Sequence, residues 1–213
     1  KRQLTTIAPV FPNAGLNQTF CFDDASVSLI PATQPGGIWL GPGVSLLAGN
    51  YAFDPSAAGV GTHAIIYTIF DGTTCETHDT LVYKVFPMPD VDAGIDQQMC
   101  SGDTVSVSGI GSLGTLPYQF SWTPTSGILS GSSTANASIQ LFNNTAADVV
   151  ESYTISLTDS AGCIATDIID ITVHPLPTVD AGVNNTLCNQ PIPFTLSGYS
   201  PVSYTHLRAH ETG

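Results

Sequence analysis

Basic residues are the scarcest feature of this chain. Only four Lys and Arg stand against 17 Asp and Glu, so the formal charge of the 213 residues is −13. Binding nucleic acid or an anionic membrane surface requires clustered Lys and Arg, because phosphates must be neutralised. The sequence therefore argues against a nucleic-acid-binding protein and against adsorption to anionic lipid.

Charge of either sign is also scarce, and long apolar runs are missing. Charged residues make up 10% of the chain and hydrophobic residues 42%, a composition that can fill a core and does not fit a charge-driven disordered chain. No run of 18 apolar residues is present, so we expect no membrane insertion of this segment. The chain shows no signal peptide, and its start at Lys1 without Met looks cut.

Motifs that would support catalysis are missing as well. The sequence has no Gly-rich phosphate loop, no HExxH metal motif and no nucleophile elbow. No His stands with a Ser and an acid in a recognisable motif. We therefore predict that the chain is not an enzyme and that it needs no cofactor, with calcium as the one ion to consider.

What the chain does contain is an internal repeat. Residues 87–94 (PMPDVDAG) recur as residues 175–182 (PLPTVDAG), at an offset of 175 − 87 = 88 residues. A unit of this length is a small domain with its own core. The same offset separates two pairs of cysteines, which are Cys75 with Cys163 and Cys100 with Cys188.

Short β-rich segments fill each repeat and helical periodicity is absent. Residues 71–72 and 159–162 are turn signals between two such segments, as in a β-hairpin. Six or seven short strands per repeat predict an all-β fold of tandem antiparallel sandwiches of immunoglobulin type. The expected strands are 26–30, 37–40, 62–70 and 80–86 in the first repeat, and 104–108, 118–122, 137–142, 153–158 and 163–173 in the second.

Trp39 and Trp122 stand in corresponding apolar strands of the two repeats, 122 − 39 = 83 residues apart. We expect each to be the buried Trp of a sandwich core, together with Tyr67 and Tyr153. The alternative is that the two indoles stack on a sugar, which would need them to be exposed.

These features divide the chain into four parts. We expect one sandwich in residues 1–87 and a second in residues 88–175. Residues 176–201 repeat only the start of a unit and should form a truncated third sandwich. Residues 202–213 match neither repeat and resemble a translated sequencing adapter, so we treat them as an artefact tail.

Several segments resemble a known family. Residues 36–44 (GGIWLGPGV) and 53–67 (FDPSAAGVGTHAIIY) resemble the immunoglobulin-like repeats of surface and secreted proteins of the Bacteroidetes. Residues 92–104 (DAGIDQQMCSGDT), 122–125 (WTPT) and 159–163 (DSAGC) resemble their polycystic-kidney-disease-like (PKD-like) domains.

This resemblance implies a location and a role. It implies an extracellular or outer-surface position, export through the type IX system, and a stalk or adhesin whose partners are surface glycans or proteins. The alternative it implies is a spacer or a carbohydrate-binding accessory region of a secreted multidomain hydrolase.

The cysteines allow three states. The simplest pairing in an exported chain lies within each repeat, Cys21 with Cys75 and Cys100 with Cys163. In an immunoglobulin sandwich, however, the first corner and the last hairpin turn lie at opposite ends, whereas a disulfide needs Cα atoms within about 7 Å. Stacking the repeats end to end would instead favour Cys21 with Cys163. Reduced thiols are the third alternative.

Three acidic residues, Asp90, Asp92 and Asp96, crowd the junction between the repeats. Carboxylate oxygens at such a boundary could hold calcium and stiffen the array. The alternative, which we favour, is a solvated acidic linker that Pro87 and Pro89 stiffen without a metal.

Three Asp-Ser/Thr-apolar triplets resemble the acceptor sites of O-glycosylation in the Bacteroidetes. They place the expected acceptor hydroxyls on Thr80, Thr104 and Ser160. Chance matches in a Thr-rich β protein are the alternative.

Overall fold

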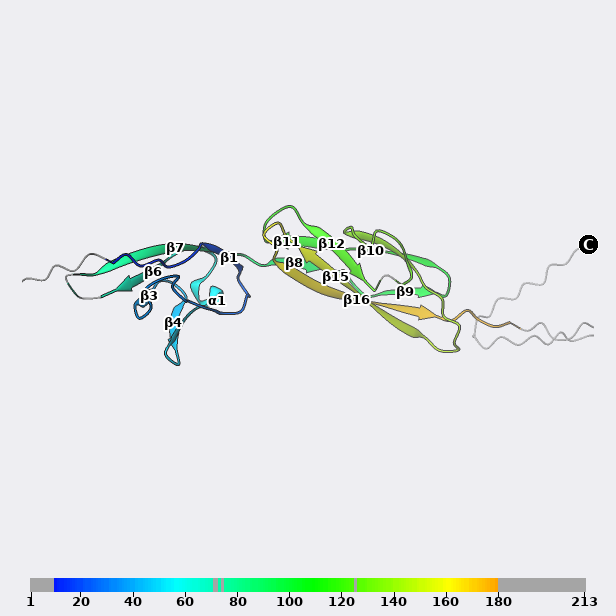
Figure 1. Cartoon of the computed structure of the whole chain (residues 1–213). Helices are drawn as coiled ribbons and strands as arrows, with labels where there is room; N and C mark the ends of the chain where they lie inside the picture. Colours follow the sequence, from blue (N-terminus) through cyan, green and yellow to red (C-terminus); the bar gives the residue numbers. More distant parts are fainter. Residues whose placement is uncertain (1–9, 71–72, 74, 125, 180–213) are drawn as a thin grey trace, which may run out of the picture.

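The computed structural model describes residues 10–70, 73, 75–124 and 126–179. The adapter-like tail and the turn at residues 71–72 therefore lie outside the described residues. Of the third repeat, only residues 176–179 are described. Within the described residues the chain is almost entirely β-strand and forms two sandwiches that lie end to end (Figure 1). The prediction of an all-β fold of tandem immunoglobulin-like sandwiches is confirmed.

The first sandwich faces a four-stranded sheet, with the order β1-β7-β6-β3, against a three-stranded sheet, with the order β2-β5-β4. Its two long strands are the β-branched and aromatic runs that the sequence predicted as a hairpin. The strands are β1 (Gln18–Cys21), β2 (Val27–Ser28), β3 (Ile38–Leu40), β4 (Val44–Leu47), β5 (Asn50–Phe53), β6 (Gly61–Ile69) and β7 (Thr77–Phe86).

One short helix, α1 (Pro55–Ala58), interrupts the first sandwich, where the sequence predicted none. Asp54 caps it: its Oδ1 accepts hydrogen bonds from the backbone N–H of Ser56 and Ala57, at 2.9 and 3.2 Å. Pro55 at the first helical position already has the backbone angle of a helix. The Ser56 hydroxyl, followed by the Ala57 N–H, lowers the pKa of Asp54 because both donate to the ionised carboxylate. A single turn is too short for periodicity to reveal.

The second sandwich repeats this plan and adds a third, two-stranded sheet. Its sheets have the orders β12-β15-β16-β9, β10-β14-β13 and β11-β8. The strands are β8 (Pro89–Asp92), β9 (Gln97–Cys100), β10 (Thr104–Ser108), β11 (Ile110–Leu113), β12 (Gln119–Thr123), β13 (Ile128–Ser130), β14 (Asn136–Gln140), β15 (Val149–Thr158) and β16 (Ile164–His174).

Two strand pairs run parallel, which differs from the expected wholly antiparallel sheets. β1 pairs with β7 so that Cys21 lies opposite Phe86, and β9 pairs with β16 so that Cys100 lies opposite His174. Parallel neighbours need a long crossover connection, and the rest of each sandwich provides it. The consequence is that the corner after β1 or β9 lies at the end of the sandwich where the last strand also ends.

Aromatic rings fill the centre of the first core. Phe20, Phe53 and Tyr83 form a triangle of rings with centroids 4.9 to 5.2 Å apart. Trp39 is 3% exposed, and its ring lies 4.7 Å from that of Tyr67, the residue opposite it in β6. The Tyr67 hydroxyl donates to the Gln34 carbonyl at 2.6 Å, so the one polar atom of this buried ring is satisfied.

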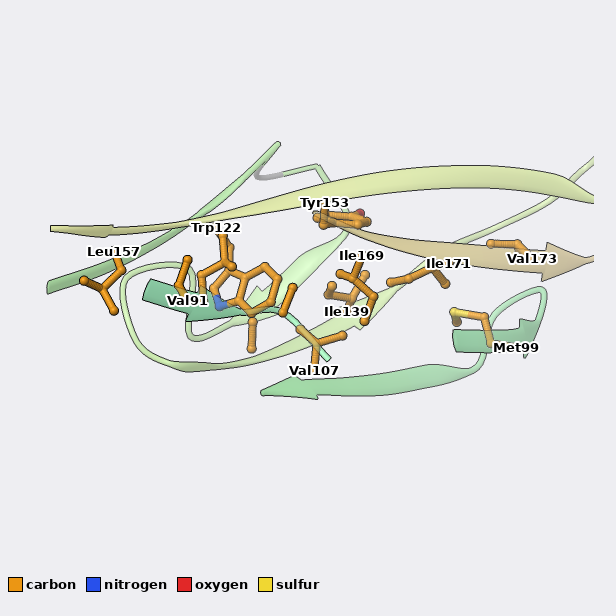
Figure 2. Close-up of a cluster of buried hydrophobic side chains, with 13 residues drawn as sticks. Val91, Met99, Val107, Trp122, Ile139, Tyr153, Leu157, Ile169, Ile171 and Val173 are labelled. Atoms are coloured by element: carbon orange, nitrogen blue, oxygen red, sulfur yellow. The ribbon is translucent and has the colours of Figure 1, made fainter. Parts of the chain in front are cut away.

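The second core is built around Trp122, which is completely buried. Figure 2 shows its ring among aliphatic side chains from several strands, including Val91 and Val107. The indole N–H donates to the carbonyls of Thr134 and Ala135, at 3.1 and 3.3 Å.

Tyr153 also lies in this core, but its position relative to the Trp differs from that of Tyr67. Ile155, not Tyr153, lies opposite Trp122. The Tyr153 hydroxyl donates to the Ser126 carbonyl at 2.6 Å. Burial, and then the nearby Glu151 carboxylate, raise the pKa of Tyr153 because both disfavour the phenolate. The two tyrosines therefore play similar roles from non-equivalent positions.

Replacing Trp122 with Ala should lower the free energy of unfolding of the second sandwich by about 3–5 kcal/mol, because a large buried ring leaves a cavity. Trp39 is then the only Trp in the chain. Its fluorescence should follow the first sandwich in a urea titration, while circular dichroism follows both. Trp122→Phe should cost less.

If the Trp39 signal were lost at the same lowered urea concentration, the two sandwiches would not be independent cores. An unchanged circular dichroism transition would contradict the central position of Trp122.

Candidate functional site at the junction of the sandwiches

A disulfide joins the two sandwiches. Cys21, at the end of β1, bonds to Cys163, which lies directly before β16, and the two Cα atoms are 5.6 Å apart. The partners are 142 residues apart in the sequence. The pairing that end-to-end stacking favoured is therefore the one that the structure contains.

The simpler pairing within each repeat was wrong, and strand length gives the reason. Cys100 lies opposite His174, at the end of β16, whereas Cys163 precedes the start of the same strand. The 11 residues of β16, at about 3.3 Å per residue, separate the two by roughly 35 Å. Cys75 and Cys21 are separated in the same way by β7. Cys75 and Cys100 are both free and exposed.

Hydrogen bonds to backbone and side-chain oxygens hold Cys21 in a tight corner. The Cys21 N–H donates to Asp24 Oδ2 at 2.7 Å, and the Asp24 N–H donates back to the Cys21 carbonyl at 3.1 Å. The Phe22 N–H donates to the Phe86 carbonyl at 3.0 Å, which ties the corner to the end of the last strand. The sulfur atom thus projects from a fixed frame at the end of the first sandwich.

Asp159 organises the turn that carries Cys163. Its side chain is buried, and Oδ1 accepts hydrogen bonds from the N–H groups of Ala161 and Cys163, both at 2.9 Å. Its Oδ2 accepts from the Thr115 N–H at 2.8 Å, which joins the turn to the neighbouring loop. Cys163 itself is 1% exposed. The turn is therefore prearranged to present one sulfur to the preceding sandwich.

The peptide linker at the junction is short. Only Pro87 and Met88 lie between β7 and β8, and the ring of Pro87 fixes its backbone angle. A single tether would allow the second sandwich to swivel in all directions. Because the disulfide adds a second covalent connection, the range of orientations open to the two sandwiches is smaller.

Sequence reasoning missed both organising carboxylates, Asp24 and Asp159. A signal for the first was present, since Cys21 and Cys100 are each followed by an Asp three residues later, Asp24 and Asp103. Nothing in the sequence distinguished Asp159 from an ordinary turn residue, because its role depends on Thr115, 44 residues away.

Asp92, one of the three calcium candidates, accepts a hydrogen bond within a turn. Its Oδ1 accepts a hydrogen bond from the Gly94 N–H at 2.8 Å, and Gly94 has a φ of +88° that favours glycine. In the first sandwich Asn13 makes the same bond to the Gly15 N–H at 2.9 Å. A neutral amide oxygen does this work as well as a carboxylate does, so the turn itself does not require charge.

The three acidic residues are engaged separately. Asp96 Oδ1 accepts from the Asp170 N–H at 3.0 Å, and Asp90 lies exposed on β8 opposite Ser112. Among residues 10–70, 73, 75–124 and 126–179, no group of three or more His, Cys, Asp or Glu is placed to hold a metal ion. Asp96 lies beside Asp170, well along β16 from Cys163, so the three carboxylates do not meet at the junction as the sequence predicted.

The candidate glycosylation residues lie on the surface. Thr80 on β7 and Thr104 on β10 are exposed. Ser160 is exposed too, but its hydroxyl lies 3.1 Å from the Thr115 carbonyl and 2.9 Å from the Leu116 carbonyl. A glycan on Ser160 would remove the proton that makes these bonds, so Ser160 fits the glycosylation hypothesis less well than Thr80 and Thr104 do.

No protein-family model and no curated protein match this chain. Solved structures with similar folds include the Ig1 and Ig2 domains of DIP-gamma, at 10% identity and a TM-score of 0.35, covering 78% of this chain and 95% of that one. An I-band fragment of titin, I67–I69, has 12% identity and a TM-score of 0.35, and the match covers 76% of this chain and 63% of the fragment.

A third similar structure is a nucleoside hydrolase-related protein from Saccharophagus degradans. It has 18% identity and a TM-score of 0.31, over 42% of this chain and 26% of that one. Similarities this low carry no argument about function. The pairing of this chain's own strands makes it a tandem immunoglobulin-like β-sandwich protein. Within the described residues, no helix has the length and hydropathy needed to cross a membrane.

Millimolar calcium should leave the melting temperature almost unchanged. Asp92→Asn should change the free energy of unfolding by no more than about 0.5 kcal/mol, because Asn13 makes the same turn in the first sandwich. Asp92→Ala is the contrasting variant, and it should cost about 1 kcal/mol since the Gly94 N–H loses its acceptor. Calorimetry with and without a chelator measures all three.

A large rise in melting temperature with calcium that Asp92→Asn abolishes would establish a metal site at the junction.

Proposed function

We propose that this chain is part of a non-catalytic, extracellular repeat array that acts as a stalk or adhesion module of a bacterial surface protein. The observation that carries the proposal is the Cys21–Cys163 disulfide between neighbouring sandwiches. Neither cysteine belongs to the hydrophobic cluster at the centre of its sandwich. The effect of the bond is to limit how the sandwiches move relative to each other, which is what a spacer that must hold a distance requires.

The disulfide also supports the proposed location. Disulfides persist in oxidising compartments and are rare in a reducing cytosol. The net charge of −13 makes copies of the chain repel one another, which favours solubility. It gives no support to nucleic acid as a partner. The proposed partners are therefore surface proteins or glycans that other parts of the array would bind.

Two other functions are alternatives to a stalk or adhesion module. A spacer in a secreted multidomain hydrolase would need the same stiffness, and only the neighbouring domains of the complete gene distinguish it from a stalk. A carbohydrate-binding module would need an exposed aromatic platform, and neither Trp39 nor Trp122 provides one, since both are buried. The first rival therefore stands closer to the observations than the second.

Breaking the junction disulfide should loosen the pair of sandwiches without unfolding either. Cys21→Ser is the suitable variant, because the Cys163 thiol that remains is buried and a buried Cys packs as a small hydrophobe. Small-angle X-ray scattering should show a broader distribution of distances for Cys21→Ser than for the unaltered protein. Circular dichroism and the fluorescence of both Trp residues should stay the same.

Cys75→Ser is the matched control, because it removes an exposed free thiol and should leave the scattering curve unchanged. Identical scattering from Cys21→Ser and the unaltered protein would contradict the mechanical role. A loss of folded signal in either sandwich would show that the bond supports a core instead.

A further inference from the structure

We propose that Cys100 is one half of a second interdomain disulfide, whose partner is the cysteine in the last hairpin turn of an adjoining sandwich of this same kind. Cys75 would bond as Cys163 does, to a sandwich at the other end of the pair, because Cys75 precedes β7 as Cys163 precedes β16. Each sandwich would then carry one cysteine at each end, and one disulfide would staple every junction. The proposal rests on the proposed function as an array and specifies how the array is joined.

The argument starts from strand register. Cys21 lies opposite Phe86 in the parallel pair β1–β7, and Cys100 lies opposite His174 in the parallel pair β9–β16. Phe86 and His174 are the last residues of the final strands of their sandwiches. Cys100 therefore occupies in the second sandwich the place that bonded Cys21 occupies in the first.

The corners that follow the two cysteines share two backbone hydrogen bonds. The Phe22 N–H donates to the Phe86 carbonyl at 3.0 Å, and the Ser101 N–H donates to the His174 carbonyl at 2.9 Å. The N–H of the Asp three residues on donates back to the cysteine carbonyl at 3.1 Å for Cys21 and at 3.0 Å for Cys100. The backbone thus projects both side chains from equivalent frames.

Further contacts hold the Cys100 corner in place. The buried Asn143 donates its backbone N–H to Ser101 Oγ at 2.9 Å and its side-chain amide to the Val173 carbonyl at 2.8 Å. The Gly102 N–H donates to the Leu141 carbonyl at 2.8 Å. Cys100 is nevertheless exposed and unbonded. A rigid corner that presents an exposed thiol resembles half of a junction whose other half is not in the described residues.

The linker supports the choice of partner. Pro87-Met88-Pro89 follows Phe86, and Pro175-Leu176-Pro177 follows His174, at the same spacing from the cysteine's register partner. The 88-residue repeat continues through residues 175–182. Figure 1 shows that β9 and β16 end at the end of the second sandwich away from the first. A sandwich that followed through this linker would meet Cys100 as the second sandwich meets Cys21.

The bond forms by exchange with a small disulfide such as oxidised glutathione. Two cysteine thiols give up two electrons and two protons as the S–S bond forms. The oxidised glutathione accepts both, its own S–S bond breaks, and two molecules of reduced glutathione are released. The reaction needs no residue of the protein other than the two cysteines.

An extended chain tests the proposal with this protein's own turn as the probe. It consists of residues 1–177 followed by a second copy of residues 90–179, so that a complete sandwich follows the natural linker and Cys188 is excluded. The chain is refolded in a glutathione buffer, and free thiols are counted by alkylation and intact mass. Chymotryptic mapping without reduction then identifies the bonded pairs.

The expected result is two free thiols, Cys75 and the copied Cys100, with Cys100 bonded to the copied Cys163. Cys100→Ser in the extended chain should raise the count to three, because the copied Cys163 loses its partner. Residues 1–177 alone serve as the control, and both Cys75 and Cys100 should be alkylated there without denaturant, as their exposure predicts.

Four free thiols, in an extended chain whose circular dichroism shows a folded third sandwich, would overturn the proposal. A bond between the copied Cys100 and the copied Cys163 would also overturn it. Neither result would affect the mechanical role of the Cys21–Cys163 bond, which scattering measures separately. The failure of this inference and the failure of the proposed function are therefore distinguishable.

Discussion

The length of the last strand in each sandwich determines which cysteines can form a disulfide. β7 and β16 run from one end of their sandwiches to the other, and a cysteine sits near each end of each strand: one just before it in the chain, and one beside its last residue through the parallel pairing with β1 or β9. Roughly 35 Å of extended backbone lies between them, which is several times the reach of a disulfide. A cysteine pair that cannot close within a sandwich can close only between sandwiches.

End-to-end stacking of the two sandwiches allows a disulfide to form between them. The end that carries Cys21 meets the end that carries Cys163, and the short linker through Pro87 brings the two together. Buried Asp159 and the corner around Asp24 hold the backbone at the two bonded cysteines. Each core remains complete without its neighbour, because the two sets of buried side chains are separate. The junction thus has a second covalent connection, while each sandwich keeps its own core.

The two sandwiches build the same turn from different residues. The turn that Asn13 makes in the first sandwich is made by Asp92 in the second, with an amide oxygen in one and a carboxylate in the other. In both, an Asp from the final strand accepts the N–H of the next residue: Asp79 from Ala14 and Asp167 from Ala93, each at 2.8 Å. These acidic residues are therefore explained in part by backbone capping, which lowers the need to invoke a metal.

The sequence by itself determined the class of fold and the existence of two units, because alternating strands, turn residues and an 88-residue repeat are local or periodic signals. It also placed Trp39 and Trp122 in strands that could only be core or binding surface. It did not reveal α1, the short strands β1, β4, β5, β8, β9, β11 and β13, or the parallel pairing of β1 and β9 with the last strands, since these have too few residues to show a period or depend on distant partners. It left the cysteine pairing open among three states. Only the tertiary structure decided that Cys21 bonds to Cys163, because that depends on which ends of two separate sandwiches meet. It also decided that Asp159 shapes the turn, because that depends on a contact with Thr115, 44 residues away.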